Sequence, residues 1–200
     1  MTAYHSTEIG TEVGESLLPF RHLETLDDIP REIAENRICS EFPESMSAEK
    51  LSALREIPDV FEMPEEFTKS AKEAGIYETE GVLGYSTKLE DPAHILKGGD
   101  VSKEIATLIH EDLHRLTHPE TLREMRESQT HRDLYEGVTE YFTAKASQDL
   151  HDFQPGECYP MQVEAARQLA GEVGDQALRD WFFKHELSNE LRQAIDRLNV

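Results

Sequence analysis

The chain has 200 residues, and its formal net charge of −21 comes from 41 acidic against 20 basic side chains. This length suffices for one domain that buries a core without disulfide support, and a hydrophobic fraction of 38% argues against wholesale disorder. A surface with this excess of negative charge repels a phosphate backbone, so we exclude nucleic acid as a partner. No run approaches the roughly 18 apolar residues of a membrane span, so we expect no membrane partner either.

The N-terminus carries neither the basic segment nor the apolar segment of a standard signal peptide. We therefore expect a soluble protein that is cytoplasmic, or that is exported by a route without such a signal. Cys39 and Cys158 lie far apart in the chain and form no CxxC pair. This arrangement favours two free thiols, with a single disulfide as the alternative.

Residues 1–28 are polar and acidic and show no periodic apolar pattern, which predicts a flexible N-terminal arm. Residues 29–200 are then expected to form a single domain. Three short helices open this domain, each indicated by helical apolar spacing or by Ser, Pro or Gly at its ends. They are predicted at residues 29–38, 47–57 and 63–75.

The segment GVLGYSTKLE, residues 81–90, is the best candidate for a strand, because Val82, Tyr85 and Thr87 favour extended backbone. A long helix is predicted next, at residues 100–117, with Asp100 or Ser102 as its cap and an apolar stripe along one face. Five further helices are predicted at residues 119–128, 131–150, 161–174, 175–186 and 189–198. The balance predicts an α+β domain that is mainly helical, with a small β element before the long helix.

The long helix contains the sequence TLIHEDLHRLTH, in which His110-Glu111-x-x-His114 matches the pattern HExxH. Two histidines four residues apart lie one above the other on a helix, so both imidazoles can bind one ion. The adjacent Glu111 can take a proton from water on that ion as a general base, and zinc would lower the pKa of that water. Because a chain rich in His and Glu can contain this pattern by chance, the third ligand is the stronger test.

Three residues are candidates for the third ligand. His118 lies about 12 Å of helical rise beyond His110, so bonds of roughly 2.0–2.1 Å cannot join it to an ion held by the motif. His131 is reachable in principle. Glu136 is favoured, because a carboxylate from an antiparallel helix can complete a His₂Glu site and leave a fourth position for water. Glu140, one turn further on, could then accept the remaining N–H of a bound histidine.

The motif at 110–114, followed by Glu136-Gly137-Val138-Thr139-Glu140 on the next long helix, resembles the gluzincin group of zinc metallopeptidases. The resemblance covers about residues 80–145 and implies a zincin-like fold with one Zn²⁺. It implies His110, His114 and Glu136 as zinc ligands, Glu111 as general base and Glu140 as the acid behind a ligand. Thermolysin-like members usually carry Asp where this chain has Glu140, and most secreted members are longer.

Gluzincins commonly add a Tyr or His that hydrogen-bonds the oxyanion formed during catalysis. Tyr159, just before a predicted helix, is our first choice for this catalytic role, and His151 and Tyr141 are alternatives. Cys158, beside Tyr159, could instead bind zinc in a latent form.

These observations predict a zinc metallopeptidase that hydrolyses peptide or protein substrates. We expect the strand at residues 81–90 to pair with an extended substrate, and the acidic surface to favour basic or neutral peptides. Two other interpretations remain open. One is a zinc-binding, peptidase-like regulator or toxin without general proteolytic activity, and the other is a non-enzymatic acidic helical interaction protein.

Overall fold

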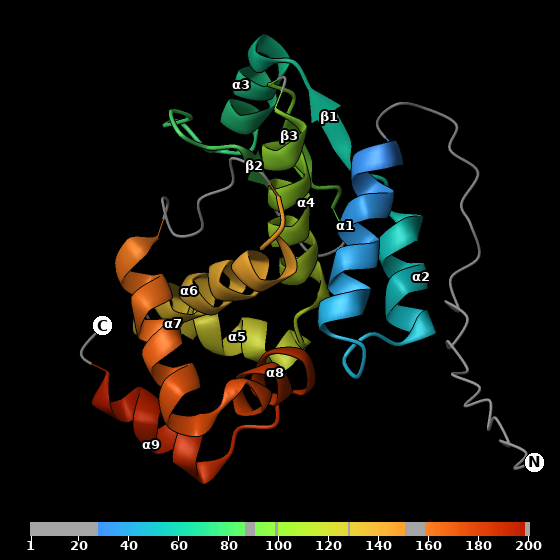
Figure 1. Ribbon diagram of the computed structural model, residues 1–200. Helices are drawn as coiled ribbons and strands as arrows, with labels where there is room; N and C mark the ends of the chain where they lie inside the picture. Colours follow the sequence, from blue (N-terminus) through green and yellow to red (C-terminus); the bar gives the residue numbers. More distant parts are fainter. Residues whose placement is uncertain (1–27, 87–90, 99, 128, 151–158, 199–200) are drawn as a thin grey trace, which may run out of the picture.

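Helices make up most of the chain in the computed structural model, which describes residues 28–86, 91–98, 100–127, 129–150 and 159–198 (Figure 1). The helices are α1 (Asp28–Glu41), α2 (Ala48–Glu56), α3 (Pro64–Glu73), α4 (Val101–Leu116), α5 (Pro119–Glu127), α6 (Gln129–Ala146), α7 (Pro160–Val173), α8 (Asp175–Lys184) and α9 (Asn189–Arg197). The structure thus confirms the prediction of a mainly helical α+β domain.

Three short strands form one sheet at one end of α4: β1 (Val60–Glu62), β2 (Gly84–Tyr85) and β3 (His94–Leu96) (Figure 1). The central strand is β3, which pairs with β1 in parallel and with β2 in antiparallel orientation. The outer strand β2 therefore leaves one edge of the sheet beside α4, with which it is in contact.

The strand predicted at residues 81–90 is wrong in its extent. Only Gly84 and Tyr85 are strand in the described part of this segment, and Gly81 has a φ of 79° in the turn before them. Residues 87–90 lie outside the described residues. The sequence also missed β1 and β3, because strands of three residues are too short to show an alternating pattern.

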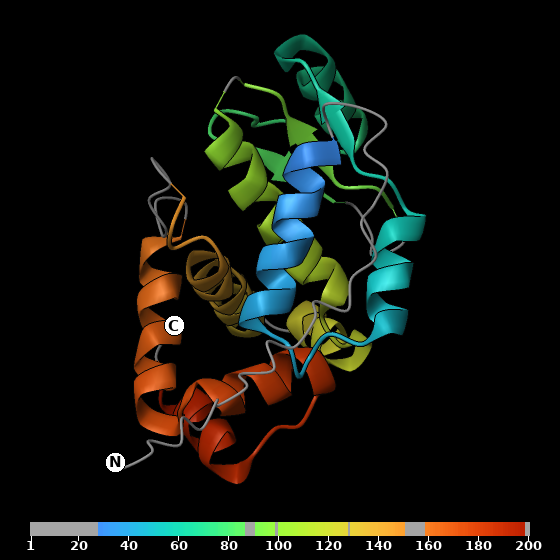
Figure 2. The same ribbon diagram turned by 45° about the vertical axis from the view of Figure 1, so that its right-hand side comes forward.

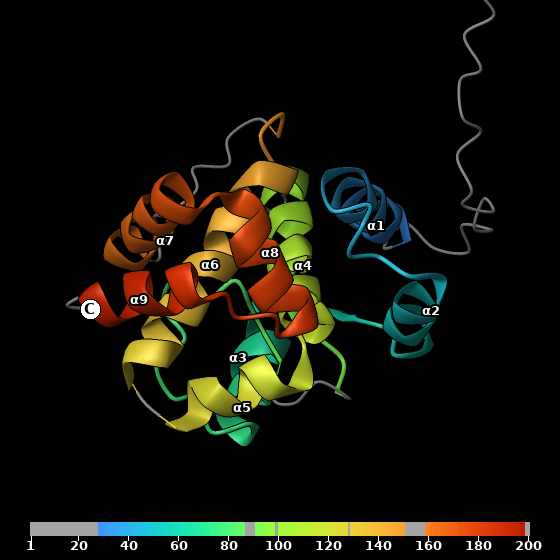
Figure 3. The same ribbon diagram turned by 90° about the horizontal axis from the view of Figure 1, so that it is seen from below.

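The helix that carries the motif, α4, lies in the middle of the structure, against α1 on one side and α6 on the other (Figures 1 and 3). It begins as predicted: Oδ1 of Asp100 accepts the backbone N–H groups of Ser102 and Lys103 at 3.0 and 3.3 Å. This cap satisfies donors that have no partner within the helix. The cap and the packing on two sides hold α4 in place.

The main hydrophobic core lies between α1, α4, α6 and the C-terminal helices. Aromatic rings of Phe42, Phe142, Phe182 and Phe183 fill its centre, with ring centroids between 4.9 and 5.9 Å apart. Ring pairs at these distances stabilise a core beyond the apolar area that they bury. Figure 2 shows α6 between α7 and α1, so the core continues across α6 to the C-terminal helices.

Helices α6 and α7 approach closely at Gly137. A Cβ at this position would lie 2.2 Å from the backbone oxygen of Gln162 and 2.5 Å from its carbonyl carbon. A side chain is therefore excluded unless one helix shifts. Gln162 lies in the first turn of α7, and Tyr159 immediately precedes that helix. The close approach at Gly137 therefore sets how near the start of α7, and with it Tyr159, lies to α6.

Several predictions from the sequence concern the ends of the chain and its cysteines. The arm predicted for residues 1–28 lies outside the described residues, except for Asp28, which begins α1. Cys39 on α1 is a free thiol, whereas Cys158 lies outside the described part. Every helix within the described ranges is too short or too polar to cross a lipid bilayer.

The close approach at Gly137 makes a testable prediction. Gly137→Ala should lower the free energy of unfolding by about 1–3 kcal/mol, because the added methyl group forces α6 and α7 apart. The matched control is Gly171→Ala on α7, where a Cβ would meet nothing within 4 Å. That change should be neutral or stabilise by up to about 1 kcal/mol. Urea unfolding measures both, and an equal effect of the two substitutions would contradict the close approach.

Candidate metal centre

Three side chains from two helices place one possible ligand atom each near a common point. His110 and His114 lie one turn apart on α4, and Glu136 reaches them from α6. The Nε2 atoms of His110 and His114 are 3.0 Å apart. Oε2 of Glu136 lies 3.3 Å from Nε2 of His114 and 3.7 Å from Nε2 of His110. The structure therefore brings together the three residues that the sequence predicted as metal ligands.

The two other histidines considered as third ligand are not part of this cluster. His118 stacks on His185 with ring centroids 5.5 Å apart, and its Nδ1 accepts the backbone N–H of Glu120 at 3.2 Å. His131 lies in the first turn of α6. Among the described residues, the group that could hold a metal ion consists of the motif histidines and Glu136.

Glu140 contacts Nδ1 of His110, the ring nitrogen that faces away from the cluster. Its Oε2 lies 3.0 Å from Nδ1 of His110, and both side chains are largely buried. An ionised carboxylate only accepts hydrogen bonds, so Nδ1 of His110 donates. This is the contact that the spacing of Glu136 and Glu140 predicted, and it leaves Nε2 of His110 turned toward the cluster.

Tyr135 contacts Nδ1 of His114 as Glu140 contacts Nδ1 of His110, and this contact was not predicted from the sequence. Its hydroxyl lies 2.7 Å from Nδ1 of His114, and its ring is buried between His114 and Phe182. In the sequence, a Tyr beside Glu136 is one of several large residues in the apolar stripe of its helix. Its polar contact depends on α4, which packs against α6 from an earlier part of the chain, so no local pattern reveals it.

The cluster is arranged to stabilise a positive charge. Burial acts to lower the pKa of His110, but hydrogen bonds to Glu136 and Glu140 and the nearby Glu111 outweigh it and raise the pKa to about 10. Burial acts to raise the pKa of Glu136, but His114 and His110 outweigh it and hold that pKa well below its usual range. The negative potential that stabilises a proton here would stabilise a metal ion as well.

A cavity of about 460 Å³ opens beside the cluster. Residues 80–84 form one of its sides and α4 and α6 form others, and its lining includes His110, Glu111, Glu140 and Tyr159. The rings of Tyr159 and His110 are almost parallel, with centroids 6.4 Å apart. A cavity of this volume has the size of a small-molecule or peptide side-chain site.

Glu111 lines this cavity and is nevertheless only 6% exposed. Burial raises the pKa of its carboxyl group; the neighbouring His114 and His110 oppose this rise, and Glu136 adds to it. A carboxylate with a raised pKa is a stronger base than an ordinary glutamate. The residue that the sequence predicts as the general base therefore lies at the cavity, with a carboxyl group whose pKa is raised.

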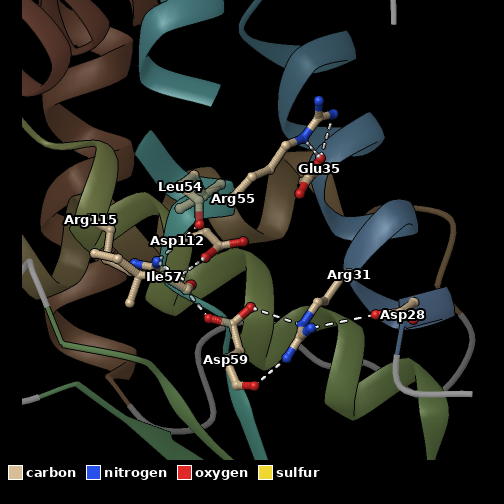
Figure 4. Close-up of polar contacts among 9 residues, drawn as sticks. All are labelled: Asp28, Arg31, Glu35, Leu54, Arg55, Ile57, Asp59, Asp112 and Arg115. Carbon is tan, nitrogen blue, oxygen red and sulfur yellow. Dashed lines mark hydrogen bonds and ion pairs between the residues drawn. The ribbon is translucent and has the colours of Figure 1, made fainter. Parts of the chain in front are cut away.

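A buried ion-pair network anchors α4 directly after the motif (Figure 4). Arg115 donates from Nη1 to Oδ1 of Asp59 at 2.7 Å and to Oδ1 of Asp112 at 3.2 Å. From Nη2 it donates to the carbonyl oxygens of Leu54 and Ile57 at 3.1 and 2.9 Å. Only 3% of the Arg115 side chain is exposed. The network joins α4 to the segment between α2 and β1.

The comparisons with protein-family models, with curated proteins and with solved structures found no match to this chain. The case for a function therefore depends on the geometry of the site.

Three other residues were candidates from the sequence: His151 and Tyr141 for the oxyanion role, and Cys158 as a zinc ligand. His151 and Cys158 lie outside the described residues. The third, Tyr141, donates its hydroxyl to Oδ1 of Asp175 at 2.6 Å and is not among the residues that line the cavity. Tyr159 is therefore the predicted oxyanion residue that the described structure places at the cavity.

The Arg115 network makes a prediction about stability. Arg115→Met leaves Asp112 buried without its cationic partner and leaves Asp59 with Arg31 alone, so we expect the free energy of unfolding to fall by about 3–5 kcal/mol. Arg123→Ala is the control, because it removes an arginine whose side chain is 64% exposed. That change should cost less than about 1 kcal/mol. Denaturant unfolding compares the two, and a similar small loss in both would show that the network does not anchor α4.

Proposed function

We propose that the protein is a zinc-dependent peptidase with a zincin-like fold. The observation that supports this proposal most is the convergence of Nε2 of His110, Nε2 of His114 and Oε2 of Glu136. Two imidazoles and one carboxylate are a ligand set of catalytic zinc sites, which leave one position open for water.

The distances between these three atoms fit zinc. A tetrahedral ion with bonds of roughly 2.0–2.1 Å separates its ligand atoms by about 3.3 Å. The three distances in the cluster are 3.0, 3.3 and 3.7 Å. Both Nδ1 atoms already have oxygen partners, Glu140 for His110 and Tyr135 for His114, so both Nε2 atoms are available for one ion.

Zinc bound by these residues would lower the pKa of its water ligand and polarise the carbonyl group of the substrate. The carboxylate of Glu111 would take a proton from the attacking water and pass it to the amide nitrogen as the C–N bond breaks. The hydroxyl of Tyr159 lies at the same cavity and would donate a hydrogen bond to the carbonyl oxygen as it gains negative charge. One water molecule is consumed, and the products are a carboxylic acid and an amine.

The substrate would lie along the cavity wall formed by residues 80–84, which leads into the outer strand β2. An extended peptide can add to such an edge through backbone hydrogen bonds. The lining contains the acidic residues Glu80, Glu111 and Glu140, and the whole chain carries a net charge of −21. These charges favour peptides that are basic or neutral around the scissile bond.

The first test is the metal itself. Wild-type protein purified without a polyhistidine tag should contain about one zinc per chain, and chelation should abolish peptide cleavage until zinc is restored. Glu136→Ala should weaken zinc binding at least tenfold, because it removes the ligand from α6. Elemental analysis and a peptide-library digest read by mass spectrometry give both results. Wild-type zinc below about 0.3 per chain after zinc is added back would leave the interaction-protein alternative.

Glu111→Gln separates catalysis from metal binding. The variant should keep its zinc, since Glu111 is not a ligand, and should lose cleavage by at least about a hundredfold, since the amide is not a base. The matched control is Glu164→Gln, an exposed residue of α7 that should leave both properties unchanged. Zinc binding in wild-type protein with no cleavage of any library peptide would instead support the regulator or toxin.

A further inference from the structure

A chain of hydrogen bonds runs from His114 through Tyr135 to Thr117. The hydroxyl of Tyr135 lies 2.7 Å from Nδ1 of His114 and 3.2 Å from Oγ1 of Thr117. Tyr135 and Thr117 are 1% and 4% exposed. Buried hydroxyl groups are satisfied by the partners around them, so these partners determine which way each proton points.

The hydroxyl group of Thr117 donates its proton to the backbone carbonyl oxygen of Leu113. The last turn of α4 is tightened: the backbone N–H of Thr117 donates to the oxygen of His114. It is therefore not directed to the oxygen of Leu113, its usual α-helical acceptor. Oγ1 of Thr117 lies 2.8 Å from that oxygen and supplies a donor in its place. Because a hydroxyl has one proton, Thr117 can only accept a hydrogen bond from Tyr135.

Tyr135 therefore donates its proton to Thr117 and offers only lone pairs to Nδ1 of His114. The hydroxyl proton of Thr139 is also already used, since it is donated to the backbone oxygen of Tyr135 at 2.9 Å. Its Oγ1 lies 3.5 Å from Nδ1 of His114. Both oxygens beside Nδ1 are thus acceptors, and Nδ1 of His114 must carry a proton to donate.

We propose that Thr117 and Tyr135 are positioning residues that hold His114 in the tautomer with its proton on Nδ1 and its lone pair on Nε2. This inference rests on the proposed function, because Nε2 of His114 is the predicted zinc ligand. In the opposite tautomer, His114 would point an N–H at the ion and could not bind it.

At Nδ1 of His114, the neutral hydroxyl of Tyr135 suits metal binding better than a carboxylate would, such as the one that Glu140 places at Nδ1 of His110. The cluster already contains the carboxylates of Glu111, Glu136 and Glu140. A fourth carboxylate behind His114 would favour a proton on both ring nitrogens, which competes with metal binding. The hydroxyl chain fixes the tautomer without adding charge.

Tyr135→Phe tests the chain, because it keeps the buried ring and removes the nearer acceptor of Nδ1, which leaves only Thr139 at 3.5 Å. We expect zinc to bind about tenfold to a hundredfold more weakly, as measured by competition with a chromophoric chelator. Tyr141→Phe is the matched control, since it removes a hydroxyl from the same helix that bonds Asp175 instead of His114. That variant should bind zinc as the wild type does.

A pair of substitutions at Thr117 tests the direction of the chain. Thr117→Val removes the acceptor of the Tyr135 proton and should weaken zinc binding about tenfold, whereas Thr117→Ser should match the wild type. Long-range ¹⁵N–¹H NMR of the imidazoles in metal-free protein gives an independent readout. The Nδ1 tautomer of His114 should dominate in the wild type and in Thr117→Ser. In Thr117→Val, protons should shift toward Nε2, because Tyr135 is then free to donate to His114.

The outcomes separate this inference from the function on which it rests. Wild-type zinc affinity in Tyr135→Phe, or an equal loss in Tyr141→Phe, would overturn the inference and leave the metal site in place. Wild-type protein that binds no zinc would overturn both. Weaker zinc binding in Tyr135→Phe without any peptide cleavage in the wild type would support the inference and contradict the peptidase.

Discussion

The fold depends on one constraint: α4 is surrounded by packed elements, yet it carries ionisable side chains that burial would destabilise without partners. Several of them are matched from another element or from the loops around the helix. Glu104 accepts the backbone N–H of Gly98, and His110 meets Glu140. Arg115 meets Asp59, which comes from the segment before β1. The polar groups of α4, as well as its apolar stripe, therefore determine where α6 and the segment between α2 and β1 pack against it.

The partners of α4 differ in charge on its two sides, and this difference has a chemical consequence. Toward α1 and α2, Arg115 lies between Asp59 and Asp112, and its positive charge is neutralised within the network. Toward α6, carboxylates predominate, so a cation is needed to balance Glu136 and Glu140 around His110. The side toward α1 and α2 anchors the helix, whereas the side toward α6 stabilises a positive charge at His110. A rigid helix between them keeps the ligand atoms at fixed separations.

The helices and the central residues of the candidate site could be predicted from the sequence because their signals are local. Apolar spacing and caps such as Asp100 indicated the helices, and the four-residue spacings of HExxH and of Glu136 and Glu140 indicated which side chains share a face. The partnership of Tyr135 with His114 and that of Arg115 with Asp59 could not be predicted. Each joins segments that meet only in the folded chain, and neither leaves a periodic pattern. The three-residue strands were missed for a related reason, since their pairing depends on neighbours elsewhere in the chain.

The short segment YEGVTE on α6 shows how closely the site and the fold are joined. Helical periodicity turns positions 135, 136, 139 and 140 toward α4, where they contact the two histidines. Gly137, about 100° around the helix from Glu136, meets the backbone of α7 instead. This six-residue stretch of α6 thus supplies a predicted ligand, contacts to both histidines and the close approach to α7, which Tyr159 immediately precedes. An acid at position 136 or 140 on a solvated helix would need none of these neighbours, whereas here each of the two acids lies against a histidine of α4.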